Sequence, residues 1–351
     1  MKAARFHARE DLRIEDIPEP GLRAGAVKIA VAWCGICGTD LHEFLEGPIF
    51  TPPPGHPHGL SNEAAPVTLG HEFSGTVEEL GEGVTGLAIG DSVVVEPYFV
   101  CDECGPCREG NYNLCTQLGF IGLAGGGGGL SEKIVVGSRW VHPVGDIPLD
   151  EAALIEPLAV AYHAVGRSGL KAGDVAVVGG AGPIGLLTAA VLKGIGVTTV
   201  VTELSAARKG KATSSGVADH LIDPSSDDVK ARVLELTGGT GADAAFECAG
   251  VNAVLDTMLD VVKPAGVVVN VSIWGRPAAV DMQKIVLKEI DLRGTIAYRG
   301  DHAAAIKLVQ DGKVDLKPFI TGRIALEDLV DKGFDTLINH NDTAVKIIVH
   351  P

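Results

Sequence analysis

The sequence predicts an α/β protein in which a parallel sheet with helices on both faces occupies the middle of the chain. Between about residues 171 and 295, apolar stretches of four to six residues alternate with longer helical patterns, as in parallel sheets. A glycine-rich turn joins the first apolar stretch to a helical pattern, as a doubly wound nucleotide-binding sheet requires. The Gly- and Pro-rich residues before this region predict a separate, mostly β domain.

The individual elements follow from local patterns along the chain. Short apolar runs between turn residues, such as 27–31 and 93–95, predict strands of the first domain. A helical pattern at 151–168 connects this domain to the parallel sheet. Strands of that sheet are expected at 175–178, 199–201, 244–246 and 267–271.

The last part of the chain has two further helical patterns after residue 296 and an apolar run at 345–349. This run predicts a final strand, which we expect to return to the first domain. The expected domains are therefore a catalytic domain at 1–155, a nucleotide-binding domain at 156–295, and a returning segment at 296–351.

Composition limits the classes of partner. The 351 residues suffice for two domains, and 46% hydrophobic with 21% charged residues indicates a folded globular chain. The 29 Lys and Arg against 45 Asp and Glu give a net charge of -16, which disfavours nucleic acid and anionic membranes. The start of the sequence lacks the apolar core of a secretory signal, and the uncharged stretch near the middle of the chain, 175–192, is interrupted by Gly and Pro. We therefore expect no membrane span.

Four cysteines crowd into one short loop: Cys101, Cys104, Cys107 and Cys115. Four thiolates can close a tetrahedral site, as structural Zn²⁺ requires. An iron–sulfur cluster is the alternative, but the ferredoxin run places its fourth Cys after three residues and follows it with Pro, whereas here seven residues intervene. Together with an odd total of seven cysteines, the loop indicates metal in a reducing cytoplasm rather than disulfides.

A second candidate metal site is scattered along the chain: Cys37, His71, Glu72 and Glu156, with Thr39 and His42 near the cysteine. One Cys, one His and one carboxylate leave a fourth position open, as in catalytic zinc sites. A thiolate and one carboxylate neutralise Zn²⁺, whereas two carboxylates would leave the site negative. We therefore expect one carboxylate to be the ligand and the other to lie in the surrounding shell.

The third motif is the sequence VGGAGPIG. Its glycines, Gly180, Gly182 and Gly185, follow an apolar strand and open a helix with Pro183 and Ile184. Glu203 follows the next strand, so the whole dinucleotide fingerprint is present. Because Glu203 would repel a 2′-phosphate, NAD(H) is preferred over NADP(H). Arg208 is expected on the adenine side.

Several other features have plainer interpretations. The histidines of the Pro-rich segment, His56 and His58, lack a nearby thiol or carboxylate in the sequence and are expected to be ordinary loop residues. Cys34 and Cys248 are expected to be structural thiols. The run of five glycines at 125–129 is expected to be a flexible turn, because no strand-to-helix junction surrounds it.

Taken together, CGTDLH, GHEFSGTVEELGEGV, the cysteine loop, EPLAVAYHAV and VGGAGPIGL resemble the zinc-dependent medium-chain dehydrogenase family over nearly the whole chain. The resemblance implies a GroES-like catalytic domain built from both ends of the chain and a Rossmann domain between them. Two loops, EGPIFTPPPGHPH and LGFIGLAGGGGGLSE, are most similar to the (R,R)-2,3-butanediol dehydrogenase branch. The paired carboxylates are nearer to the sorbitol dehydrogenase pattern than to that of alcohol dehydrogenases with a third Cys ligand.

The resemblance implies reversible hydride transfer between NAD and a secondary alcohol or vicinal diol, with one catalytic and one structural Zn²⁺ per chain. Thr39 and His42 are implied as the path by which the hydroxyl proton leaves. The expected partners are an alcohol or ketone and further copies of the chain, as a dimer or tetramer. A sorbitol or polyol dehydrogenase remains the alternative enzyme, and a zinc- and NAD-binding sensor without turnover is the alternative outside enzymes.

Overall fold

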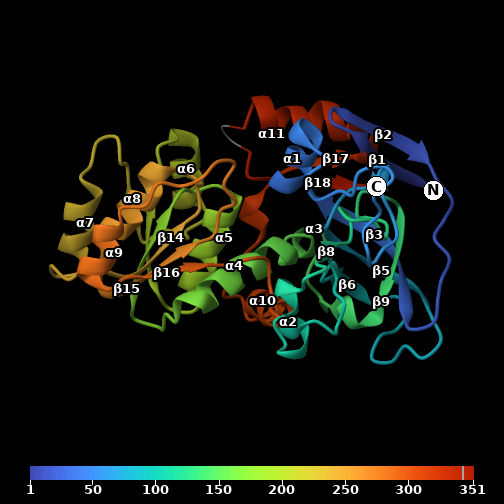
Figure 1. Cartoon of the computed structure of the whole chain (residues 1–351), viewed down its shortest axis with the longest axis horizontal. Coiled ribbons are helices and arrows are strands. Elements are labelled where there is room, and N and C mark those ends of the chain that lie inside the picture. Colours follow the sequence, from blue (N-terminus) through green and yellow to red (C-terminus); the bar gives the residue numbers. More distant parts are fainter. Residues whose placement is uncertain (342–343) are drawn as a thin grey trace. The chain divides into compact units, whose positions relative to one another are not determined.

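The computed structural model describes residues 1–341 and 344–351, which form two compact units (Figure 1). Unit 1 comprises Met1–Glu156 and Ile320–Pro351, and unit 2 comprises Pro157–Phe319. The chain thus returns to unit 1 at residue 320, not at residue 296 as the sequence analysis placed it. Contacts along the segment hold it to unit 2: Asp301 Oδ2 lies 2.9 Å from His163 Nδ1 at the start of helix α10 (His302–Gln310), and Lys211 Nζ donates to the Pro318 carbonyl at 3.1 Å.

Unit 1 is mostly β structure. Its largest sheet has the order β10-β6-β5-β3-β18-β17, with β9 also paired to β3, and β1, β2 and β4 form a smaller sheet. The strands are β1 (Lys2–Ala8), β2 (Asp11–Asp16), β3 (Ala26–Gly35), β4 (Val67–Thr68), β5 (Glu72–Leu80), β6 (Ser92–Val95), β7 (Tyr98–Phe99), β8 (Gly119–Phe120), β9 (Lys133–Gly137), β10 (Val141–Pro143), β17 (Ile320–Ala325) and β18 (Lys346–His350).

The final strand β18 pairs with β3 in antiparallel fashion, with Ile348 opposite Gly35 and Val349 opposite Cys34. The expected return of the last strand to the first domain is thereby confirmed. The helical segments of unit 1 are short: α1 (Gly38–Glu46), α2 (Gly105–Arg108), η1 (Tyr112–Leu114), η2 (Ser138–Trp140), α3 (Leu149–Ala152), η4 (Leu326–Asp328), η5 (Leu329–Phe334) and α11 (Asp335–Asn339).

The helix expected at 151–168 is interrupted. It forms α3, which ends at Ala152, and α4 (Ile155–Ser168), which crosses from unit 1 into unit 2. Pro157 explains the break, because proline has no N–H and its ring collides with the carbonyl four residues earlier. Proline is tolerated in the first turn of a helix, and α4 accordingly begins two residues before it.

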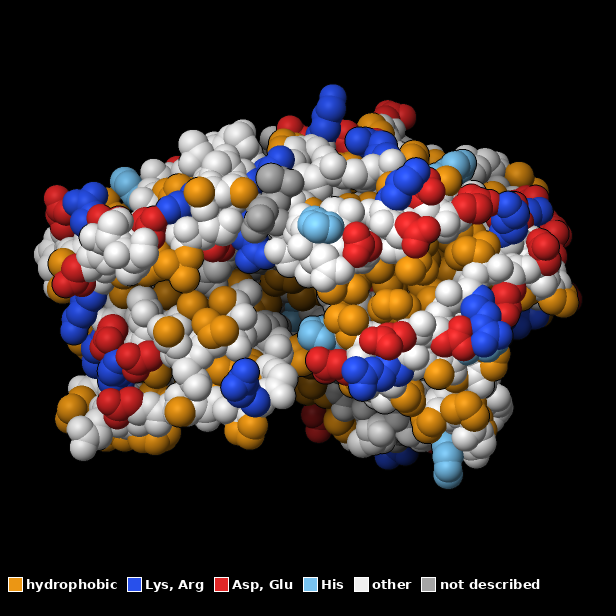
Figure 2. Space-filling view, turned by 90° about the horizontal axis from the view of Figure 1, so that it is seen from above, with side chains coloured by type: hydrophobic (Ala, Val, Ile, Leu, Met, Phe, Trp, Pro, Cys, Tyr) orange, Lys and Arg blue, Asp and Glu red, His pale blue; other side chains and the backbone are white. Residues whose placement is uncertain are grey.

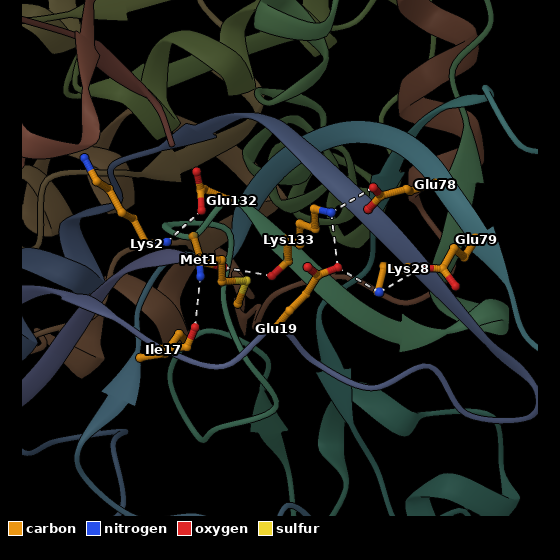
Figure 3. Close-up of polar contacts among 10 residues, drawn as sticks. Met1, Lys2, Ile17, Glu19, Lys28, Glu78, Glu79, Glu132 and Lys133 are labelled. Atoms are coloured by element: carbon orange, nitrogen blue, oxygen red, sulfur yellow. Dashed lines mark hydrogen bonds and ion pairs between the residues drawn. The ribbon is translucent and has the colours of Figure 1, made fainter.

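Ionic contacts reinforce the sheet of unit 1 (Figure 3). Lys28, which is only 8% exposed, donates to Glu19 and Glu79 at 2.8 Å each, and Lys133 donates to Glu19 and Glu78 at 3.1 and 2.8 Å. Glu19 therefore holds two strands, β3 and β9, through one carboxylate.

Unit 2 is a six-stranded parallel sheet with the order β13-β12-β11-β14-β15-β16. Helices lie on both of its faces (Figure 1), as a doubly wound sheet requires. Its elements are β11 (Val175–Gly179), α5 (Pro183–Gly194), β12 (Thr198–Thr202), α6 (Ala206–Ser214), β13 (His220–Ile222), α7 (Val229–Leu236), β14 (Ala242–Glu247), α8 (Asn252–Val261), β15 (Val262–Asn270), α9 (Met282–Lys288), β16 (Asp291–Gly294), α10 and η3 (Lys317–Phe319). The expected strands of the parallel sheet are confirmed.

Each unit has its own apolar core. In unit 2, Val177, Val268 and Met258 belong to a cluster in which strands and helices pack together. On the face drawn in Figure 2, acidic and basic side chains are interspersed rather than separated into patches of one sign. Within the described ranges, every helix is too short or too polar to cross a bilayer.

Candidate active site

The cysteine loop of unit 1 gathers its four thiols at one point. The candidate ligand atoms of Cys101, Cys104, Cys107 and Cys115 all lie within 4.8 Å of one another. Cys104 is the N-cap of α2, and Cys115 follows η1 directly. The two short helical turns thus reverse the chain and return the fourth thiol to the first three.

Backbone N–H groups donate to the sulfurs of the loop and favour the thiolate form at Cys104, whereas burial raises the pKa of Cys107 to about 12 and also raises that of Cys115. Backbone N–H groups of Cys101 and Gln117 donate to Cys115 Sγ at 3.3 Å each, and Cys104 N–H donates to Cys101 Sγ at 3.3 Å. Backbone N–H groups of Thr116 and Cys107 lower the pKa of Cys104 to about 6. A tetrahedral site with Zn–S distances of about 2.3 Å places its sulfurs about 3.8 Å apart, so this cluster fits structural zinc.

A second cluster forms where the strands β3 and β5 meet. Cys37 caps the N-terminus of α1, just after β3, while His71 and Glu72 stand at the start of β5. The register pairs Gly35 with Glu72, which brings these two segments together. The ligand atoms of Cys37, His71 and Glu72 all lie within 4.8 Å of one another. The pairing of β3 with β5 thus brings together Cys37 and His71, which are 34 positions apart in the sequence.

A buried carboxylate that the sequence analysis missed supports this cluster. Asp40 is fully buried, accepts the backbone N–H of Cys37 at 2.9 Å, and places Oδ1 at 3.6 Å from Nδ1 of His71. Burial disfavours the charged imidazole, but the negative charges of Asp40 and Cys37 outweigh it, so the pKa of His71 lies well above its ordinary value. Asp40 therefore places a buried carboxylate beside Nδ1 of His71, at an ion-pair distance rather than a hydrogen-bond distance.

Glu72 has a cationic partner that also escaped the sequence analysis. Lys346, at the start of β18, is 4% exposed and donates from Nζ to both carboxylate oxygens of Glu72 at 2.7 and 2.6 Å. A third bond reaches the carbonyl of Ile36 at 3.0 Å. The available signal was one lysine at the head of an otherwise apolar strand, KIIV. The negative charge of Glu72 is thus already compensated by the protein.

The other expected site residues have different positions. Glu156 lies in the first turn of α4, is 6% exposed, and does not belong to the group of ligand atoms within 4.8 Å, although its charge helps to raise the pKa of His71. The Thr39 hydroxyl lies 3.7 Å from Cys37 Sγ. His42 is exposed on the same helix α1. A hydroxyl at the cluster and an imidazole at the surface therefore share one helix.

The glycine motif of unit 2 occupies the turn between β11 and α5. Gly180 has φ of +98°, and a Cβ on Gly185 would lie 1.9 Å from the carbonyl oxygen of Gly180. Gly182 caps α5, with Pro183 and Ile184 as its first residues. Strands β11 and β14 are neighbours while β12 continues on the other side, so the turn lies at the switch point where doubly wound sheets bind ligands.

Glu203 directly follows β12 and joins this turn. Its carboxylate accepts the backbone N–H of Ala181 at 2.8 Å through Oε2, and those of Leu204 and Ser205 at 2.8 and 2.9 Å through Oε1. Arg208 lies half-buried in the first turn of α6. The carboxylate is therefore fixed within one peptide of the nucleotide-binding glycines.

Known proteins with the same organisation settle the family. Residues 23–146 match the alcohol dehydrogenase GroES-like domain, and residues 183–311 match the zinc-binding dehydrogenase domain. The chain is 62% identical to (R,R)-butanediol dehydrogenase of Neisseria gonorrhoeae over 352 positions, which cover 100% of this chain and 99% of the relative. The chain belongs to the zinc-dependent medium-chain dehydrogenase family.

Solved structures of this dehydrogenase family agree with the chain in fold. The crystal structure of 2R,3R-butanediol dehydrogenase from Bacillus subtilis superimposes with a TM-score of 0.93 at 47% identity, covering 100% of this chain and 99% of that one. A zinc-binding dehydrogenase of Sinorhizobium meliloti, with a TM-score of 0.87 at 30% identity over 100% of this chain and 99% of its own, is bound to NADP. The expected GroES-like and Rossmann domains are thereby confirmed.

The family assignment also fixes the chemistry of the two clusters in outline. The four-cysteine loop is a structural zinc site, and the Cys, His and Glu cluster is a catalytic zinc site. The iron–sulfur alternative is thereby wrong for the cysteine loop. The family is one of enzymes, so the alternative of a sensor without turnover is set aside.

Proposed function

We propose that this dehydrogenase interconverts (R,R)-2,3-butanediol and (R)-acetoin with NAD(H), and that it reduces diacetyl. The observation that carries the proposal is full-length identity of 62% to an (R,R)-butanediol dehydrogenase, in a chain that holds Cys37, His71 and Glu72 at one point. A carbonyl or alcohol with a neighbouring oxygen fits a polar metal site better than a simple ketone does.

The catalytic ion is held by Cys37, His71 and Glu72 in this proposal, because their ligand atoms lie within 4.8 Å of one another. Glu156 lies outside this group and serves as the neighbouring carboxylate, while Lys346 offsets the charge of Glu72. When bound, zinc supplies Lewis acidity that lowers the pKa of a substrate hydroxyl. Asp40 contributes a buried negative charge 3.6 Å from His71 Nδ1.

Proton removal is assigned to helix α1. Thr39, next to the Cys37 thiol, accepts the proton of the substrate hydroxyl at its Oγ1 and passes on its own. His42 is exposed and exchanges protons with water, so it completes a path from the site to the surface. The position of Thr39 and His42 on one helix, three residues apart, supports this assignment.

The nucleotide is assigned to the glycine turn of unit 2, and its nicotinamide ring supplies or accepts the hydride. N–H groups at the start of α5 face the pyrophosphate, and Glu203 binds the ribose hydroxyls. The position of the Glu203 carboxylate on Ala181 N–H supports a preference for NAD(H), because a 2′-phosphate would meet this negative charge. Arg208 remains assigned to the adenine side.

Self-association is proposed through the edge of the unit 2 sheet. Strand β16 is an edge strand, and Leu292 on it is 40% exposed. The neighbouring helix α9 exposes Val286 by 68% and Leu287 by 81%. An edge strand and apolar side chains together favour pairing with a second copy, so we expect a homo-oligomer. The described residues include all seven cysteines, and none of them is in a disulfide, which supports a reducing, cytoplasmic location.

A substrate panel tests the proposed reaction. We expect kcat/KM for reduction of (R)-acetoin with NADH to exceed that for 2-butanone by about tenfold, equivalent to about 1.4 kcal/mol of transition-state binding. Fructose in the same panel tests the polyol alternative. Equal values for acetoin and 2-butanone, or higher values for fructose, would contradict the butanediol assignment while leaving the family unchanged.

A further inference from the structure

Residues 122–129, called the glycine run, lie against the backbone that precedes His71 and include the five glycines at 125–129 that we expected to form a turn. Gly122, Gly125, Gly126 and Gly127 have left-handed conformations with φ of +85°, +101°, +75° and +82°. A Cβ on Gly122 would lie 2.0 Å from the carbonyl oxygen of Gly70 and 3.2 Å from the backbone nitrogen of His71. Only glycine permits both the conformation and this approach.

Hydrogen bonds fasten the run to the residues that precede His71. Gly129 N–H donates to the Gly70 carbonyl at 2.8 Å, and Leu130 N–H donates to the Leu69 carbonyl at 3.0 Å. A Cβ on Gly128 would lie 2.2 Å from the same Leu69 carbonyl oxygen. The carbonyl groups of Leu69 and Gly70, the two residues before His71, are therefore held on one side by hydrogen bonds from backbone N–H groups.

The opposite side of the run is held by the Pro-rich segment, residues 48–66. Ser61 Oγ donates to the carbonyl of Ala124 at 2.5 Å, and Gly126 N–H donates to Glu63 Oε1 at 3.0 Å. A Cβ on Gly125 would lie 2.6 Å from Cβ of Glu63. The glycine run thus lies between the Pro-rich segment and the ligand-bearing backbone.

The Pro-rich segment is itself anchored at its other end to the helix that begins at Cys37. The carboxylate of Glu43, fully buried on α1, accepts backbone N–H groups of Ile49 at 3.0 Å and Thr51 at 3.2 Å. The Pro-rich segment is therefore fastened at two points. Glu43 holds its beginning to α1, and Glu63 holds its end to the glycine run.

We propose that Glu63 and the glycine run are positioning elements for the zinc ligand His71, with Glu63 acting through Gly126 and Gly122. This inference rests on the proposed catalytic role of the Cys37 and His71 site. If the hydrogen bond from Gly126 N–H to Glu63 is lost, we expect Gly122 to move away from Gly70. The backbone of His71 then becomes more mobile, although no residue in direct contact with His71 has been changed. Glu63 is exposed, so it does not contribute to the apolar core. Its contribution is the hydrogen bond that it accepts from the glycine run.

Hydrogen exchange and Co(II) release from the catalytic site test the proposal. We expect Glu63→Ala to speed exchange of the Gly129 and Leu130 amides, and removal of Co(II) by a chelator, by about threefold to tenfold, the range for loss of one hydrogen bond. Glu63→Gln retains an acceptor oxygen and should restore both rates. Glu82→Ala, an exposed control, should change neither.

A matched pair of glycine variants separates support from backbone strain. Gly83 has φ of +82°, as Gly122 has +85°, but a Cβ on Gly83 meets no atom within 4 Å. Gly122→Ala should release Co(II) at least about tenfold faster than Gly83→Ala does, because both carry the same strain and only one collides with Gly70. If Gly122→Ala does not fold, the Glu63 pair decides.

Two results would overturn the proposal: equal Co(II) release from the two alanine variants, or no difference between Glu63→Ala and Glu82→Ala. Absence of acetoin reduction by the unaltered enzyme would instead refute the proposed function. That failure is distinguishable, because the exchange rates of Gly129 and Leu130 do not depend on turnover.

Discussion

Replacing Lys346 by Met removes the cation that donates hydrogen bonds to both oxygens of the Glu72 carboxylate. Glu72 is 1% exposed, and both of its oxygens bind Lys346 Nζ at 2.6 and 2.7 Å. Loss of one partner of a buried pair leaves an uncompensated charge, which costs about 3 to 5 kcal/mol. Burial disfavours the charged amine, but the negative charge of Glu72 outweighs it and raises the pKa of Lys346, so the amine is charged at neutral pH.

The assay is urea unfolding followed by circular dichroism, with Lys332→Met as control. Lys332 pairs with Asp328 at 3.0 Å, but the two side chains are 65% and 37% exposed, so its loss should cost at most about 0.5 kcal/mol. The double variant Lys346→Met with Glu72→Leu should recover most of the lost stability, because an apolar pair can replace a buried ion pair. A loss below about 1 kcal/mol for Lys346→Met, or no recovery in the double variant, would refute the reasoning.

Three further predictions concern the metal, nucleotide and proton sites. Cys104→Ser should reduce zinc from two ions per chain to one and lower the melting temperature before it affects KM, as metal analysis and calorimetry would check. Glu203→Ala with Leu204→Arg should raise kcat/KM for NADPH relative to NADH by about tenfold or more; a native preference for NADPH would contradict the role of this carboxylate. His42→Ala should retain zinc and slow alcohol oxidation mainly below about pH 8, because proton expulsion then needs the relay; a uniform loss at all pH values would argue against it.

Motifs that lie close together in sequence could be predicted, whereas contacts made only by folding could not. The spacing of Cys101, Cys104 and Cys107 and the glycines before α5 indicated their sites directly, because neighbouring residues carry each signal. Asp40 was missed although it lies between Thr39 and His42, since a carboxylate in a first helical turn is usually a surface residue.

Lys346 and the glycine run show why the remaining site escaped sequence analysis. The partner of Lys346 lies 274 residues away, and nothing in the local pattern indicates which strand it joins. For the run, a series of glycines predicts conformational freedom, and only the fold shows that Gly122 lies against the backbone of Gly70. The division of the chain at residue 320 depended in the same way on distant contacts, such as those of Asp301 with His163 and of Lys211 with Pro318.

Strand β18 also determines when the catalytic cluster can form during synthesis. The amine of Lys346 reaches Ile36 across 310 residues of chain, and the whole of unit 2 is translated between them. At a ribosomal rate of about 5 to 20 residues per second, the early strands of unit 1 wait many seconds for β18. During that interval the end of β3, at Cys34 and Gly35, lacks its β18 partner, and the carboxylate of Glu72 has no amine beside it. A nascent chain halted before β18 therefore holds Cys37 and His71 but not the completed sheet, which makes it a natural substrate for chaperones.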